Sequence, residues 1–448
     1  MTQLVRSLYW LLSKSLTVFI AIGLCIGSSI APAVAGQKVV NLWTLMTQPQ
    51  RIEGMQKVIT HFEKANPDIK VELSSVGWGE AHTKLMAAVA AGNPPDIAVE
   101  SYGWPITYSQ MGILQPVDDV IAAIGEDNYL PQDLKLNYYD GHHWGVKLYG
   151  TPSVLYYRKD IFEAKGLKPP KTWDEMLALA EALNDPANNF YGTVVTGGSA
   201  ELTNVMVWDF MSNNGATVFN ANRPATPDDV VFNSKETIET FEFLKKLHKF
   251  SPPGSEMWGS AEYSSMFHTG RIAMVAEMMF GHARILADAP DMADKIGVAK
   301  LPTGPSLGDR QGSFLYNTVG FMVFKDAPEP EAAKKFLTFL MTNDDVYVEW
   351  LLSYPFAMWP VTYSAQEKFF NAPALQRFPE HVKLGLDVLE TGSVTAMFHG
   401  ATPYWGEMEA RHTLSAVMQR MLIDKWPVEK AVAEGAKKIK EIVEEFTE

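Results

Sequence analysis

The sequence predicts an α/β protein built as two lobes, and three observations support this fold class. The chain has 448 residues, which is long for a single hydrophobic core. Between residues 38 and 101, strand-like and helix-like segments alternate, and this alternation predicts a parallel sheet. Apolar residues make up 47% and charged residues 20%, the balance of an ordinary folded globular protein.

The N-terminal elements follow from their residue patterns. Short apolar segments rich in β-branched residues predict strands at 38–45, 69–76 and 94–101. Helical spacing predicts a helix at 50–67 that stops at Asn66-Pro67, and an alanine-rich helix at 80–93 that ends at Gly92. Strand, helix, strand, helix, strand in this order describes a βαβαβ unit.

The middle of the chain is expected to be mainly helical. Thr172 begins a helix at 172–184, and Glu175 three residues later predicts a capping box. Other expected elements are a helix at 234–250, a helix from 260 that turns at Gly270 into a strand ending at 277, a strand at 318–324, a helix at 328–342, and a helical region at 407–448 interrupted at Trp426-Pro427.

Residues 1–35 have the pattern of a secretory signal. A basic region with Arg6 and Lys14 precedes an apolar run of 11 residues, Leu16–Ile26. Small residues at Ala33 and Ala35 predict cleavage before Gly36. The alternative, an N-terminal membrane anchor, is disfavoured because the apolar run is too short to span a bilayer.

Cys25 is the only cysteine of the chain. A lipoprotein signal needs a small residue before its cysteine, whereas Leu24 stands here, so we do not expect lipid attachment at Cys25. Removing residues 1–35 leaves a chain without cysteine, which has no disulfide. A long exported chain of this kind suits the bacterial periplasm, where we expect this protein to be.

The charge balance argues against two classes of partner. The chain carries a formal net charge of −14, and residues 1–35 hold two basic residues and no acid, so the remainder carries −16. Such an acidic surface argues against nucleic acid and against anionic lipid as partners.

The usual motifs of catalysis and metal binding are missing. The sequence has no glycine-rich dinucleotide motif, no P-loop and no H-E-x-x-H. The neighbours His142 and His143 are expected to point to opposite sides of an extended segment, so they make poor partners for one metal ion. We therefore predict no cofactor, no metal site and no catalytic residue.

Five segments, in order along the chain, resemble the extracellular solute-binding proteins of ABC importers, specifically the carbohydrate-binding branch that includes maltose-binding protein. The best marked is "LYYRKDIFEAKGLKPPKTWDEMLALAEAL" (155–183). The others are "PPDIAVESYGWPITYSQMGILQPVDDVI" (94–121), "SSMFHTGRIAMVAEMMF" (264–280), "GFMVFKDAPEPEAAKKFLTFLMTND" (320–344) and "KWPVEKAVAEGAKKIKEI" (425–442). Together they span nearly all of the chain after residue 38.

The resemblance implies a periplasmic binding protein fold, in which two α/β lobes are joined by a hinge that the chain crosses three times. We expect the crossings near 151–154, 314–317 and 354–359. The N-terminal lobe then comprises 36–152 and 316–354, and the C-terminal lobe comprises 153–315 and 355–448. A carbohydrate or polyol would lie between the lobes of a monomer, and closure on it would favour docking to the transmembrane subunits of an ABC permease.

A sugar presents hydroxyl edges and apolar ring faces, so its site needs aromatic rings together with acids and amides. The ends of strands and the loops between lobes supply the expected ligand-binding residues, which are Trp43, Glu80, Glu100, Tyr102, Trp208, Trp258, Glu277, Phe280, Asn317 and Trp359. Phe280 stands where the family usually has tryptophan. Core packing is the alternative for the tryptophans, and a helix-start charge is the alternative for Glu80. Tyr404 and Trp405 form a weaker candidate pair.

Two other functions remain open from the sequence. A secreted glycoside-acting enzyme would need two carboxylates about 5–10 Å apart, which Glu80, Glu100 and Glu277 could nominally supply. The same fold could also bind iron or a polyamine. The tyrosine pairs 138–139 and 156–157 suggest iron, but neighbours in a strand face opposite sides, so neither pair forms a two-tyrosine site alone.

Overall fold

The computed structural model describes residues 36–100, 103–198, 201–220, 225–307, 316–392 and 402–446. The chain divides into a short unit, residues 1–37, and a compact unit, residues 38–448. The second unit holds the described helices and strands. Within these ranges no helix combines the length and the apolar character that crossing a membrane requires.

The predicted βαβαβ unit is confirmed. Strand β1 (Lys38–Thr44) pairs in parallel with β2 (Ile69–Ser75) and with β3 (Ile97–Val99), and the crossovers are α1 (Pro49–Ala65) and α2 (Trp78–Ala90). Strand β3 is shorter than the predicted segment 94–101. The carboxyl ends of the three parallel strands meet at one edge of the sheet, where α1 and α2 begin.

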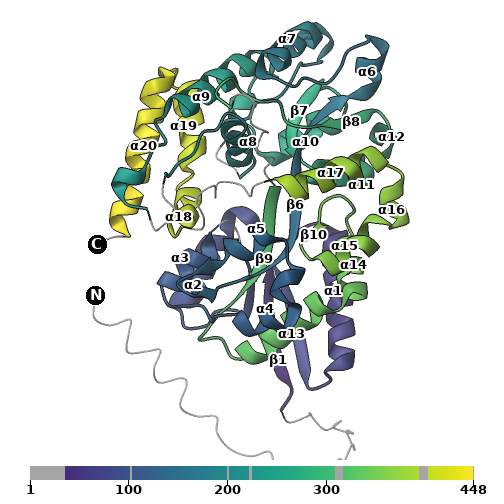
Figure 1. Ribbon diagram of the computed structural model, residues 1–448, viewed down its shortest axis with the longest axis vertical. Helices are drawn as coiled ribbons and strands as arrows, with labels where there is room; N and C mark the ends of the chain where they lie inside the picture. The colour runs from purple at the N-terminus through teal and green to yellow at the C-terminus, as the bar shows by residue number, and fades with distance from the viewer. Residues whose placement is uncertain are drawn as a thin grey trace, which may run out of the picture. The chain divides into compact units, whose positions relative to one another are not determined.

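One long strand connects the rest of the sheet (Figure 1). Strand β6 (Val146–Arg158) pairs through its first half with β9 (Tyr316–Val323) and β10 (Trp359–Pro360). Its second half pairs with β7 (Met274–Met278) and β8 (Ile296–Ala299). Strand β9 also pairs with β3, so the sheet order is β10-β6-β9-β3-β1-β2, with β7 and β8 attached through β6 alone.

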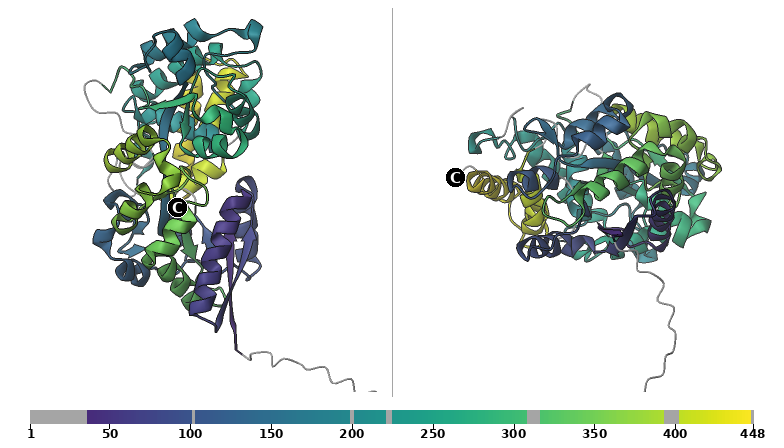
Figure 2. Two further views of the ribbon diagram at one scale, coloured as in Figure 1. Left: turned by 90° about the vertical axis from the view of Figure 1, so that its right-hand side faces the viewer. Right: turned by 90° about the horizontal axis from the view of Figure 1, so that it is seen from below.

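Helix α1 packs on α13 (Pro330–Thr342) and α14 (Asp344–Leu351), as Figures 1 and 2 show. Gly54 allows this contact, because a Cβ at residue 54 would lie 2.5 Å from the Ser353 hydroxyl oxygen. The remaining elements before β6 are α3 (Trp104–Gln110), α4 (Asp118–Ile124), α5 (Pro131–Leu136) and the hairpin of β4 (Tyr138–Tyr139) and β5 (His142–His143).

The elements between β6 and β9 are mainly helices, as predicted. They are α6 (Lys159–Ala164), α7 (Trp173–Leu183), α8 (Glu201–Ser212), α9 (Lys235–Leu247), α10 (Ser260–His268), α11 (Phe280–Asp288) and α12 (Pro290–Ala293). The capping box is confirmed at α7, where the Glu175 amide donates to Thr172 Oγ1 at 3.3 Å and the Thr172 amide donates to Glu175 Oε2 at 3.3 Å.

The C-terminal region has one break more than predicted. Its helices are α15 (Tyr363–Phe370), α16 (Pro373–Gln376), α17 (Pro379–Thr391), α18 (Tyr404–Ala410), α19 (Thr413–Leu422) and α20 (Val428–Glu445). The predicted interruption at Pro427 caps α20. A second break follows α18, because His412 has a φ of 51°, in the left-handed region that a helix cannot contain. Helices α19 and α20 then pack side by side (Figure 1).

Side chains alternate along β6 and separate two hydrophobic clusters. Val154 and Tyr156 belong to the larger cluster, which also contains the core around β1, α1 and α13. Leu155 belongs to the smaller cluster, which contains α7, α9 and the C-terminal helices α19 and α20. The larger cluster therefore continues along β6 from one half of the strand to the other.

A buried ion pair joins β3 to β6. Glu100 directly follows β3 and is 0% exposed, and its carboxylate pairs with the Lys147 ammonium. Asn137 Nδ2 donates to the other carboxylate oxygen at 2.7 Å. Burial raises the pKa of Glu100, whereas the charge of Lys147 and the hydrogen bonds from Lys147 and Asn137 oppose that shift. The Glu100 carboxylate thus has a structural role in this conformation.

We predict that Lys147→Met lowers the free energy of unfolding by about 3–5 kcal/mol, because it leaves a buried carboxylate without its counter-charge. Urea denaturation followed by circular dichroism measures the change. The matched control is Lys84→Met, which breaks the exposed pair with Glu80 and should leave stability at the wild-type value. Equal effects of the two substitutions would contradict a structural role for the Glu100–Lys147 pair.

Candidate functional site

The three predicted hinge crossings lie side by side in the sheet. Thr151 in β6 pairs with Asn317 in β9, and the Thr151 hydroxyl donates to the Ala357 carbonyl oxygen at 2.6 Å. Gly150, one residue earlier, pairs with both β9 and β10. Asn317 is buried, and its Nδ2 contacts Met278 Sδ at 3.6 Å. Residues 314 and 315 of the second crossing lie outside the described ranges.

Phe280 is the centre of an aromatic and cationic cluster next to these crossings. It is the first residue of α11 and is half-buried. The Arg284 guanidinium lies 4.7 Å from the Phe280 ring centroid, and the Arg51 guanidinium lies 5.6 Å from it. The Tyr354 ring is 5.5 Å away in a tilted arrangement. Phe280 therefore keeps a partly accessible ring at a point where α1, α11 and the third crossing meet.

Glu277 lies on β7 opposite Val154 of the hinge strand and is 5% exposed. Tyr263 donates its hydroxyl to Glu277 Oε2 at 3.0 Å. Burial raises the pKa of Glu277 to about 7, although the positive charge of Arg284 and the Tyr263 hydrogen bond favour the carboxylate. Glu277 thus exchanges a proton near neutral pH and can either donate or accept a hydrogen bond.

Trp359, a predicted ligand-binding residue, is enclosed in the core in this conformation. It is 0% exposed, and its indole Nε1 donates to the Phe356 carbonyl oxygen at 2.7 Å. A Cβ at Gly385 would lie 2.3 Å from the ring, so α17 packs directly on it. The sequence indicated Trp359 as part of the predicted third crossing but did not reveal that α15 and α17 enclose it.

A buried group of phenylalanine and histidine rings packs around the third crossing. Phe356 has a φ of 70°, which is strained for a residue with a side chain, and it is fully buried. Its ring packs edge-on against His282, which in turn lies 4.4 Å from His381 between ring centroids. Burial lowers the pKa of His282 well below its usual range and the pKa of His381 to about 4. Both rings are therefore neutral at physiological pH.

Glu80 also has a different environment from the expected one. It lies in the first turn of α2, is exposed, and pairs with Lys84 one turn later at 2.5 Å. The Lys84 hydrogen bond and charge lower the pKa of Glu80. Glu100 is enclosed in its ion pair with Lys147, so its carboxylate is not accessible in this conformation.

Trp208 is buried on α8 and packs edge-on against Trp405, with ring centroids 4.7 Å apart. Tyr404 is buried as well and donates its hydroxyl to the Ala225 carbonyl oxygen at 2.6 Å. These rings support a contact between α18 and α3, in which the Thr107 hydroxyl donates to the Pro403 carbonyl oxygen at 2.6 Å. In this conformation they serve packing rather than ligand contact.

Two of the predicted ligand-binding tryptophans remain partly exposed. Trp43 near the end of β1 and Trp258 after the 3-10 helix Ser255–Met257 are both half-buried and pack on the larger hydrophobic cluster. Each keeps part of its side chain exposed. Tyr102 lies outside the described residues.

The structure reveals four members of the cluster that sequence reasoning missed: Arg51, Tyr263, Arg284 and Tyr354. Tyr354 lies at the edge of the predicted third crossing, and Arg284 lies one turn after Phe280. The positions of both residues in the sequence therefore indicated that they lie near the candidate site. Arg51 lies one turn into the helix that follows β1, the same edge as Trp43. No signal in the sequence indicated Tyr263, because only the packing of α10 on α11 brings it close to Glu277.

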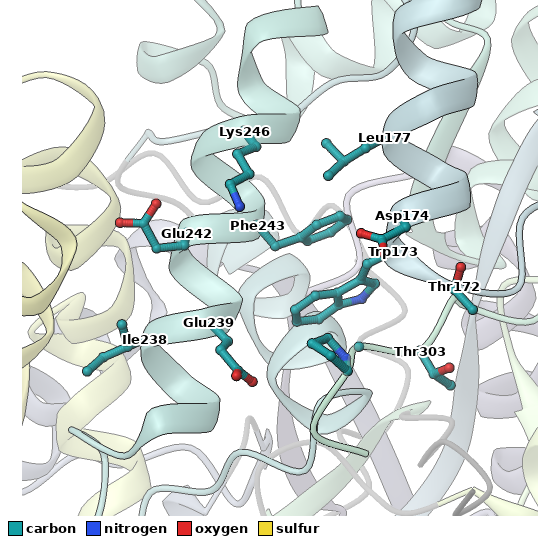
Figure 3. Close-up of a pocket in the computed structure, with 12 residues that line it drawn as sticks. Thr172, Trp173, Asp174, Leu177, Ile238, Glu239, Glu242, Phe243, Lys246 and Thr303 are labelled. Carbon is teal, nitrogen blue, oxygen red and sulfur yellow. The ribbon is translucent and has the colours of Figure 1, made fainter. Parts of the chain in front are cut away.

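A separate groove of about 510 Å³ lies between α7 and α9 (Figure 3). Trp173 and Phe243 stack in it with ring centroids 4.3 Å apart, and Glu239, Glu242 and Lys246 border it. The predicted ligand-binding residues do not line this groove. Trp173 is itself buried, so the aromatic pair stabilises the packing of the two helices.

His142 and His143 do not point apart as expected. Both rings contact the Asp118 carboxylate, through Nδ1 at 2.7 Å and 3.0 Å, because the hairpin places β5 against the start of α4. In the ranges that the structure describes, no group of three or more histidine, cysteine, aspartate or glutamate residues is arranged to hold a metal ion.

Comparison with known proteins places this geometry in context. The family model described as "Bacterial extracellular solute-binding protein" matches residues 48–347. The chain is similar to the arabinooligosaccharide-binding protein of Halalkalibacterium halodurans, with 24% identity over 71% of this chain and 70% of that protein. It is also similar to the mannitol-binding protein of Pseudomonas aeruginosa, with 24% identity over 63% of this chain and 65% of that protein.

Solved structures share the fold. Maltose-bound MalE3 of T. maritima superposes with a TM-score of 0.76 and 22% identity, over 90% of this chain and 99% of that one. At this identity the likeness shows the periplasmic binding protein fold, which confirms the fold class that the sequence predicted.

We predict that two buried groups change the free energy of unfolding with pH in opposite directions. The first group is Glu277. Its pKa of about 7 is raised above the ordinary value of 4.5, so its contribution to stability is largest below pH 4.5 and is lost as the pH rises through 7. Glu277→Gln should therefore gain about 3 kcal/mol relative to wild type between pH 4.5 and 8. Urea denaturation at several pH values measures this difference, and parallel profiles would contradict a buried acid.

The second group is His381. Its pKa of about 4 is lowered from the ordinary 6.5, so its contribution is present above pH 6.5 and is lost as the pH falls toward 4. His381→Phe keeps a ring in place and removes the titration. The variant should gain about 3 kcal/mol relative to wild type when the pH falls from 7 to 4. An unchanged difference over that range, in the same denaturation assay, would show that His381 accepts its proton freely in the folded state.

Proposed function

The chain belongs to the bacterial extracellular solute-binding protein family, and we propose that it captures a sugar, oligosaccharide or polyol for an ABC importer. The cluster around Phe280 carries this proposal. It combines a half-buried ring with a buried acid, Glu277, whose hydroxyl partner is Tyr263. An aromatic face beside groups that can donate and accept hydrogen bonds is what recognition of a hydroxylated ring or chain requires.

The position of the cluster supports binding between two lobes. The proposed lobes are 36–152 with 316–354, and 153–315 with 355–448, so Arg51 and Phe280 would belong to different lobes. A ligand that contacts both would hold them together, and the closed form would then be presented to the permease. The relatives named for arabinooligosaccharide and mannitol binding support this class of ligand.

We further propose that the protein acts as a monomer in the periplasm, after cleavage of its leader before Gly36. The family is extracellular, which supports export. The surroundings of Glu80 and Glu100 favour binding over glycoside hydrolysis, because each carboxylate is already engaged by a lysine. The iron alternative gains no support from Tyr156, which is fully buried and accepts a hydrogen bond from the His282 amide at 3.2 Å.

We predict that at least one member of a panel of mono-, di- and trisaccharides, polyols and glycosides raises the melting temperature without being converted. A ligand at one hundred times its Kd stabilises the folded state by about 2.7 kcal/mol. Thermal shift measures the stabilisation, and chromatography of the incubated ligand measures turnover. A stabilising sugar that is also cleaved would contradict a pure binding role.

Phe280→Ala should weaken binding of that ligand roughly fivefold to tenfold, because about 1 kcal/mol of ring stacking is lost. Phe339→Ala is the matched control, since it removes a half-buried ring from α13, in the proposed N-terminal lobe. Isothermal titration calorimetry compares the two affinities. Equal affinities for both variants would remove Phe280 from the site.

A further inference from the structure

We propose that the ligand of this site is an acidic sugar, in which a carboxylate accompanies the hydroxyl groups. The inference rests on the function proposed above and names the chemical class of the ligand. Two guanidinium groups, those of Arg51 and Arg284, lie within 6 Å of the Phe280 ring centroid. A ligand that reaches the edge of Phe280 would therefore meet two cations.

Arg51 is the more unusual of the two. It is 5% exposed, and its terminal nitrogens donate to the Tyr149 hydroxyl and, at 3.2 Å, to Gln48 Oε1. Its Nε has no hydrogen-bond partner, and among the described residues no carboxylate lies within ion-pair distance of its guanidinium. A buried cation without a counter-ion is costly, so the arginine needs a negative partner from outside the chain.

The backbone adds positive potential at the same place. Helix α1 has 17 residues and begins two residues before Arg51, and helix α11 has 9 residues and begins at Phe280. The N-terminal ends of both helices carry partial positive charge and attract anions. Two helix starts, one from each proposed lobe, thus meet beside two arginines.

Among the described residues, the acids near this cluster do not pair with Arg51. Glu277 is buried beside Tyr263, and its high pKa means that it is only partly ionised near neutral pH. Asp288, at the far end of α11, is largely exposed, and water screens it. A ligand carboxylate would give Arg51 a negative partner, and a guanidinium binds a carboxylate through its planar set of donors.

The experiment compares ligands that differ in charge alone. Calorimetry at pH 7.5 and low salt titrates the protein with D-glucuronate, D-galacturonate and short oligogalacturonates, and with D-glucuronamide, D-glucose, D-galactose and D-mannitol. The amide keeps the shape of the acid and removes its charge. We expect at least one acidic ligand to bind ten or more times more tightly than its neutral counterpart, with an affinity that falls as salt is added.

Variants then test the arginine itself. Arg51→Gln should reduce the affinity for the acidic ligand at least tenfold and reduce the preference over the amide, whereas Arg51→Lys should restore part of it. Arg271→Gln, at an exposed position before β7, is the matched control. Circular dichroism establishes that each variant is folded, and if Arg51→Gln is not, the comparison of acid with amide on the wild-type protein decides the question.

The outcomes separate the two proposals. Tighter binding of an acidic ligand supports the acidic-sugar inference. Equal or tighter binding of neutral sugars or mannitol overturns the inference and leaves the proposed transport function standing. If none of these compounds binds but another member of the thermal-shift panel does, the inference falls and the proposed function stands. If no member of that panel binds either, both fall.

Discussion

Strand β6 is the element on which the rest of the structure depends. Its first half pairs with β9 and β10 and its second half with β7 and β8, so one continuous backbone belongs to both proposed lobes. At its middle, Thr151 pairs with Asn317 and donates its hydroxyl to the Ala357 carbonyl oxygen. These contacts bring the three crossings within one hydrogen-bonded strip, and any rotation of the lobes would have to bend it.

The same strip explains why the candidate ligand residues come from distant parts of the sequence. Glu277 lies opposite Val154 because β7 pairs with β6. Strand β7 leads directly into α11, which begins with Phe280. Helix α1 begins after β1 and brings Arg51 to the same ring. A binding site at this junction responds to both lobes at once, which is the property that a binding protein recognised by its closed form requires.

Local patterns in the sequence predicted those structural features that depend only on residues close together in the chain. The βαβαβ unit and the Thr172 capping box are examples, since spacing within one segment decides them. The candidate site was predicted only in part, because burial depends on partners far along the chain. Glu100 meets Lys147 in the core, and α17 covers Trp359; neither contact leaves a trace in local sequence. The family resemblance supplied the class of function, while the cation Arg51 emerged only from packing.

Hydrogen–deuterium exchange, with and without a saturating ligand chosen by thermal shift, tests the central claim most directly. If the ligand binds at the junction beside β6, amide protection will increase together at the start of α1 and the start of α11, the two segments that carry Arg51 and Phe280. Protection confined to the groove between α7 and α9, with no change at either helix start, would contradict the account.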